Sequence, residues 1–140
     1  MNTYAKIATL SDIRDSITGH ANPIPTRTLA LRAAEVVRDE QFNGFLYPLA
    51  AGHRLRAAIL WGRIGDLVTG QSRVDAYALA AVLAHDSGNL PLAANYVIRL
   101  QQLARAERLD IPPVVEELKR QHAFREILVR AHPGGGQVQQ

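Results

Sequence analysis

The stretch from Val74 to Leu109 constrains the fold of this chain more than any other part of the sequence. Its first half, up to His85, is small and apolar on nearly every side, whereas its second half is apolar on one side and polar on the other. The turn sequence Asp86-Ser87-Gly88-Asn89 separates the two halves. This pattern predicts two helices that fold back on each other and form a helical core.

The remaining sequence divides into further helices, and no segment has a convincing strand pattern. The predicted helices cover residues 3–17, 27–41, 53–68, 73–85, 91–108 and 114–131. We therefore predict an all-α fold, a compact bundle of about six helices that forms one domain over residues 1–132. Residues 133–140, PGGGQVQQ, lack an apolar pattern and are expected to be disordered.

The helix predicted over 53–68 is apolar around most of its circumference and should be central in the fold. It contains Gly62 and Gly65, and a glycine inside a helix costs about 1 kcal/mol relative to alanine. Close approach of a neighbouring helix on the glycine side would compensate for this cost. Trp61 belongs to the apolar arc of the same helix and is expected to be buried.

The last predicted helix has two apolar faces that a single straight helix cannot bury in one core. Val114, Val115 and Leu118 lie on one face, and the residues from Phe124 onward lie nearly opposite. Either the helix bends near Gln121, or its second half packs against a partner. The candidate partner surface consists of this second face together with an apolar residue that lies among polar ones on the preceding helix: Phe124, Ile127, Leu128, Ala131 and Ile98.

The sequence contains no recognisable catalytic or cofactor-binding motif. It has no cysteine, which excludes thiolate nucleophiles and cysteine-bound zinc. It also lacks the nucleophile elbow, the Walker motif and the dinucleotide-binding glycine motif. His122 and Glu126, one helical turn apart, are interpreted as a surface pair and not as metal ligands. We therefore predict no enzyme activity, no cofactor and no metal.

His85 and Asp86 stand where the first helix of the central hairpin should end. A histidine in the last turn interacts favourably with the exposed carbonyls and the helix dipole. The alternative is a binding or general-base role at the mouth of the hairpin.

The net charge is +3, and no run of five like charges occurs. Arg54, Arg56 and Arg63 form the most basic stretch and are candidate nucleic-acid contacts, with Trp61 among them as a stacking surface. Because Trp61 belongs to the apolar arc, we favour a buried tryptophan beside solvated arginines. No apolar run is long enough to span a membrane and no leader is visible, so a cytoplasmic location is expected.

The segment from Val74 to Leu100 resembles a single tetratricopeptide-type hairpin, an antiparallel pair placed at the centre of the bundle. The resemblance lies in its small and large positions: Ala80, Ala81, Gly88, Ala93, Val97 and Leu100. No second copy follows at a 34-residue offset and the closing proline is absent, so the resemblance implies one hairpin and not a repeat array.

A second resemblance covers LWGRIGDLVTGQSRVDAYALAAVLAHDSGNLPLAANYV. This segment is similar to the helical end of an uncharacterised actinobacterial family with a similar glycine-turn hairpin. The chain contains 14 arginines against 2 lysines and has 21 alanines, a bias that resembles proteins of GC-rich genomes. The resemblance points to an actinobacterium or one of its phages, and it implies no activity.

These observations favour a non-catalytic helical module for protein–protein interaction, an adaptor or regulator. We expect it to bind a protein partner or to form a homodimer through the last helix. The alternative is a small basic regulator that binds nucleic acid through Arg54, Arg56 and Arg63. A third interpretation is a small-molecule pocket between the helices predicted over 53–68 and 73–85, for which the sequence specifies no ligand.

Overall fold

The computed structural model describes residues 1–19 and 23–131, and the tail expected to be disordered lies outside the described residues. Within the described ranges the fold is all-α, as predicted, with no strand. The α-helices are α1 (Thr3–Thr18), α2 (Arg27–Val37), α3 (Arg54–Leu67), α4 (Gly70–Asp86), α5 (Leu90–Glu107), α6 (Pro113–Lys119) and α7 (His122–Ala131). Two 3-10 segments, η1 (Asn43–Phe45) and η2 (Pro48–Ala50), connect α2 to α3.

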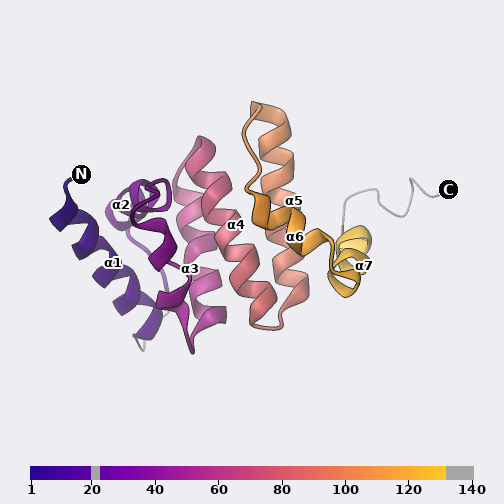
Figure 1. Cartoon of the computed structure of the whole chain (residues 1–140), viewed down its shortest axis with the longest axis horizontal. Helices are drawn as coiled ribbons and strands as arrows, with labels where there is room; N and C mark the ends of the chain where they lie inside the picture. The colour runs from indigo at the N-terminus through magenta and orange to yellow at the C-terminus, as the bar shows by residue number, and fades with distance from the viewer. Residues whose placement is uncertain (20–22, 132–140) are drawn as a thin grey trace.

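The helices stand side by side in chain order from α1 to α5, and α7 follows beyond α5 (Figure 1). The central helix is α4, which packs against α2, α3, α5 and α6. It forms the predicted hairpin with α5, and Gly88 in the connecting turn has a φ of 89°, a conformation that favours glycine. Asn89 caps α5 by accepting a hydrogen bond from the backbone N–H of Leu92 at 3.2 Å.

Gly62 and Gly65 allow two tyrosine rings to lie directly against α3. A β-carbon on Gly65 would stand 2.5 Å from Cε1 of Tyr77, and one on Gly62 would collide with the ring of Tyr96. The two rings stack on each other with centroids 6.0 Å apart. The expected close approach of neighbouring helices at this flank is therefore confirmed, with both α4 and α5 contributing a ring. Trp61 is fully buried, as expected.

A polar cluster joins the same three helices at the end of α3. The hydroxyl of Tyr77 donates to the carboxylate of Asp66, and the guanidinium of Arg99 donates to Asp66 at 2.6 Å and to the Tyr77 hydroxyl at 2.8 Å. Arg73 donates to the carbonyl oxygens of Gly65 and Val68 at 2.9 and 2.8 Å, which satisfies carbonyls that the end of α3 leaves without helical partners.

The predicted last helix is two helices, which is why the described residues hold one α-helix more than expected. The break falls between Lys119 and His122, so the bend expected near Gln121 is observed as a full interruption. Because α6 packs against α4 and α7 packs against α5, each short helix buries its own apolar face. In the described part of the chain, no helix has both the length and the apolar composition needed to cross a membrane.

Candidate interaction groove along α4

An apolar groove runs along α4 on the side that faces neither α3 nor α5. Its volume is about 420 Å³. The walls come from α2, the η1–η2 region, α4 and α6, and the lining residues are Val37, Asn43, Leu46, Tyr47, Asp75, Ala78, Leu79, Val82 and Val114. We call this the α4 groove. Leu79, Val82 and Val114 are each half-buried, so apolar side chains remain partly open to solvent there.

The groove follows from the sequence of α4. Asp75, Ala78, Leu79 and Val82 are spaced by three, one and three residues, which places them on one face of the helix. The other faces are occupied by α3 and α5. A helix that is apolar on every side should be buried on every side. Here the third side is covered only partly, because α6 is a short helix and η1–η2 is a pair of single turns.

One end of the groove carries Asp75, whose side chain is about one-fifth exposed. Gln71 donates a hydrogen bond to Asp75 at 2.9 Å and also holds the backbone of Asp110 through its amide. Arg38 approaches the carboxylate of Asp75 at 3.5 Å. Burial raises the pKa of Asp75 above its ordinary value, and the hydrogen bond from Gln71 and the charge of Arg38 only partly oppose this shift.

A second polar group closes the other end. The hydroxyl of Tyr47 donates to Asp86, and Nδ1 of His85 lies 3.0 Å from the second carboxylate oxygen. Burial acts to raise the pKa of Asp86, but the hydrogen bonds from Tyr47 and His85 outweigh it and leave that pKa below its usual value. Conversely, the hydrogen bond to Asp86 raises the pKa of Tyr47. Arg54 lies over the Tyr47 ring, 5.7 Å from its centroid.

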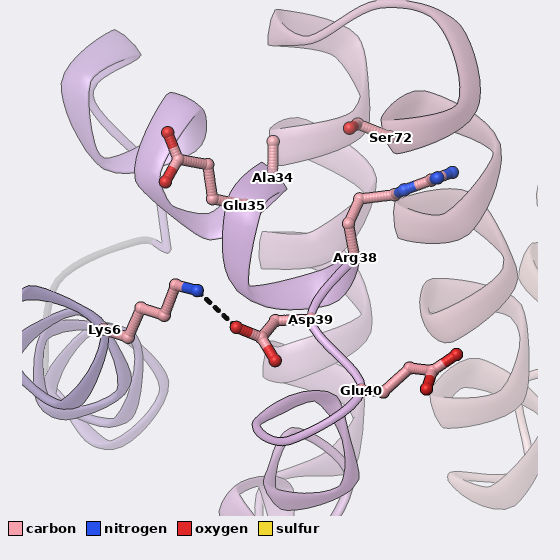
Figure 2. A pocket seen from close by; sticks show the side chains of 7 residues that line it. All are labelled: Lys6, Ala34, Glu35, Arg38, Asp39, Glu40 and Ser72. Atoms are coloured by element: carbon pink, nitrogen blue, oxygen red, sulfur yellow. Dashed lines mark hydrogen bonds and ion pairs between the residues drawn. The ribbon is translucent and has the colours of Figure 1, made fainter. Parts of the chain in front are cut away.

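A larger and more polar cavity of about 620 Å³ lies between α1, α2 and α4. Figure 2 shows its lining side chains, with Lys6 reaching from α1 to Asp39 and with Arg38 and Glu40 extending away from that pair. Arg38 and Ser72 line this cavity, whereas their neighbours Val37 and Asp75 line the α4 groove. The ion pair between Arg38 and Asp75 therefore stands where the two meet.

The structure corrects the candidate partner surface on the last helix. Phe124, Leu128 and Ile98 are 1%, 7% and 8% exposed, so all three belong to the core of this chain. Ile127 is half-buried against the same core, and only Ala131 is exposed. The physical reason is the break before His122, which turns the second apolar face toward α5. The second apolar face, which a straight helix could not bury in the same core, is therefore buried there.

Each of the three candidate nucleic-acid contacts interacts with another part of its own chain. Arg56 donates to the carbonyl oxygens of Ile17 and Ser16 at 2.7 and 3.3 Å, and so completes the end of α1. Arg63 donates to the carbonyl oxygen of Pro23 at 3.2 Å. Arg54 instead covers Tyr47. Two of the three guanidinium groups therefore make contacts with backbone carbonyls of their own chain.

The structure also gives the positions of the candidate histidines and of the suggested small-molecule pocket. His122 and Glu126 lie 3.8 Å apart with both side chains more than half exposed, in keeping with the surface pair expected from sequence. His85 does lie at the hairpin mouth, where it contacts Asp86 and packs edge-on against Phe124 with ring centroids 5.6 Å apart. At the contact between α3 and α4, the suggested location of a small-molecule pocket, the ring of Tyr77 lies against Gly65.

Sequence reasoning did not identify the α4 groove. One signal was available. Asp75 is the only charged residue between Val74 and Ala84, and a helix that is otherwise apolar over this stretch needs covering on three sides. The other walls come from η1–η2 and from the break in the last helix, neither of which has a periodicity that predicts its position. Comparison of the chain with protein-family models, with curated proteins and with solved structures found no match in any of the three.

Proposed function

We propose that this protein is a non-catalytic helical interaction module that binds a segment of a protein partner in the α4 groove. The observation that carries the proposal is the half-covered third face of α4. Leu79, Val82 and Val114 expose part of their apolar surface in a depression that has polar groups at both ends. Apolar grooves with a few polar groups at their edges are the surfaces into which partner helices and extended segments dock.

The polar groups at the groove suit anchoring better than catalysis. In a catalytic site, the Tyr47 hydroxyl would be the reactive group, and Asp86 together with His85 would be the base that activates it. Its pKa is raised, which weakens it as a nucleophile or base near neutral pH. Asp86, held below its usual pKa, is an acceptor that fixes the ring of Tyr47 in the groove wall.

We also propose that the hairpin of α4 and α5 is built like a single tetratricopeptide repeat. Ala80, Ala81 and Ala93 are fully buried, and small residues at these positions allow the two helices to pack closely. In such a hairpin the first helix carries the face that remains available to a ligand, which here is the face of α4 that lines the groove.

A displayed library of random 12-residue peptides, selected on the full-length protein, tests the proposed function. Selected peptides, synthesised with a fluorescent label, are titrated by anisotropy against wild type, Leu79→Gln and Leu103→Gln. Leu103 is a matched control, since it is also a half-buried leucine but lies on α5 outside the groove. We expect at least a tenfold loss of affinity for Leu79→Gln and little change for Leu103→Gln.

Val82→Thr provides a second groove variant with nearly unchanged volume, and circular dichroism checks that each variant keeps its helix content. If no peptide is enriched, or if the enriched peptides bind both groove variants as tightly as wild type, the proposed function is wrong.

A further inference from the structure

Carboxylates outnumber cations where the polar cavity meets the α4 groove. Glu35 is paired with the amino group of Met1 at 3.4 Å, and Asp39 is paired with Lys6. Of the remaining two carboxylates, Asp75 is paired with Arg38 at 3.5 Å, and Glu40 lines the same cavity (Figure 2). The whole chain carries a net charge of +3, so this local excess of one carboxylate runs against the overall charge.

Asp75 is the one of these four carboxylates that lines the α4 groove. Its one cationic neighbour, Arg38, stands at 3.5 Å with almost half of its side chain exposed. Ion pairs that share a good hydrogen bond are shorter, about 2.7–2.9 Å. Asp110 lies near enough to disfavour the charged form of Asp75 further. A further cation within about 4–6 Å would favour the charged form of such a partly buried carboxylate.

The far end of the groove offers no equivalent place. Asp86 receives the Tyr47 hydroxyl on one oxygen and faces His85 on the other, and the charge of Arg54 also lies close to it. Both carboxylates have a partner at each oxygen, but the contacts differ in length. Among the described residues, Oδ2 of Asp75 has only the 3.5 Å ion pair with Arg38, whereas both oxygens of Asp86 have partners at hydrogen-bond distance.

We propose that the α4 groove selects a partner segment in which a lysine or arginine stands next to bulky apolar side chains, with the cation meeting Asp75. This inference rests on the proposed function and adds the chemistry of the partner. Asp75 and Val82 are seven residues apart on α4, which is about 10 Å along the helix axis. An extended segment covers that distance in about three residues, so the cation and the apolar anchors are close neighbours in the partner sequence.

The peptides selected on the full-length protein provide the test. A protein of net charge +3 attracts acidic peptides non-specifically, so enrichment of lysine or arginine beside apolar residues among groove-dependent peptides is diagnostic. The tightest such peptide is synthesised twice, once with its cation and once with glutamine in that place. Both forms are titrated against wild type, Asp75→Asn and Asp15→Asn, an exposed aspartate on α1 that serves as the matched control.

We expect Asp75→Asn to weaken the cationic peptide about tenfold and to leave the glutamine peptide unchanged, while Asp15→Asn changes neither. Raising the salt concentration should weaken the cationic peptide on wild type and have much less effect on Asp75→Asn. Asp75→Ser is a second variant, should the asparagine variant lose helix content.

The outcomes separate the two proposals. Peptides that bind in the groove, as judged by Leu79→Gln, but are equally tight on Asp75→Asn would overturn the cationic preference and leave the proposed function intact. Absence of any groove-dependent peptide would overturn both. Sedimentation of wild type showing a dimer that dissociates on Leu79→Gln would identify a second copy of the chain as the occupant, and would likewise overturn the cationic preference.

Discussion

Tyr77 occupies the space in which a side chain on Gly65 would begin, since its Cε1 atom lies 2.5 Å from the position of a β-carbon there. The ring cannot move aside easily, because its hydroxyl donates to Asp66 and Arg99 donates to that hydroxyl. Helix propensity alone would favour alanine at Gly62 and Gly65. The packing of the Tyr96 and Tyr77 rings on α3 requires glycine at both positions.

Gly65→Ala should therefore destabilise the protein, although alanine stabilises a helix by about 1 kcal/mol relative to glycine. Overpacking of a filled core costs about 1–3 kcal/mol, and we expect a net loss in the free energy of unfolding measured by urea denaturation. The control is Gly44→Ala, where a β-carbon would meet nothing within 4 Å. Equal stability of Gly65→Ala and wild type would show that the ring of Tyr77 relaxes.

Stability should decline between about pH 10 and pH 12 because of Tyr77. Burial, the largest cause, and the hydrogen bond to Asp66 raise the pKa of Tyr77 from 10.0 to about 12. In this interval the unfolded tyrosine loses its proton while the folded one keeps it, so the unfolded state is favoured as pH rises. The stabilisation is fully present below pH 10, and its loss amounts to about 2–3 kcal/mol at most.

Urea denaturation at a series of pH values measures this effect. Tyr77→Phe removes the titrating group and should flatten the curve in this interval relative to wild type. A Tyr77→Phe curve parallel to that of wild type would assign the decline to other groups.

Phe124→Ala should cost about 3–5 kcal/mol in the free energy of unfolding, because the ring is 1% exposed and packs against His85. Val129→Ala is the control on the same helix, since that side chain is 42% exposed and its loss should change stability by less than about 0.5 kcal/mol. Sedimentation of the folded variants tests the original partner-surface prediction. Dissociation of a wild-type dimer on Phe124→Asp, with helix content intact, would contradict the core assignment.

Arg56→Met should lower stability by about 1–3 kcal/mol, because it removes charged donors from the carbonyl oxygens of Ile17 and Ser16. Arg14→Met is the control, an exposed arginine on α1. Both variants are also titrated with labelled duplex DNA at about 50 mM salt. Unchanged stability of Arg56→Met together with weaker, salt-dependent DNA binding would instead support the nucleic-acid alternative.

Local signals in the sequence predicted most of the helical framework. Thr26, which caps the start of α2, and Gly88, which stands in the hairpin turn, are such signals, because capping and turn chemistry act over a few residues. Asn89, predicted only as part of that turn, also caps α5. The end of α2 was placed four residues too late. Residues 38–41 contain no glycine or proline to end the helix, yet the chain turns there and the side chain of Asp39 accepts the backbone N–H of Gln41.

The α4 groove was not predictable to the same degree, because it depends on distances between segments far apart in the chain. Nothing around Val37 or Val114 in sequence indicates that they approach the same face of α4. The burial of the predicted last helix likewise depends on contacts between segments far apart in the chain. Its two apolar faces were correctly recognised, but only the packing of α6 on α4 and of α7 on α5 decides that both faces are internal.

The dispersed origin of the groove walls has a thermodynamic consequence. A depression assembled from positions as distant as 37, 47, 79 and 114 exists only when the chain from α2 to α6 has folded together. A segment bound there has no affinity for the unfolded chain, so its binding free energy adds to global stability through mass action. Saturation would thus raise the melting temperature of the entire helical array and slow amide hydrogen exchange in elements that the ligand never touches.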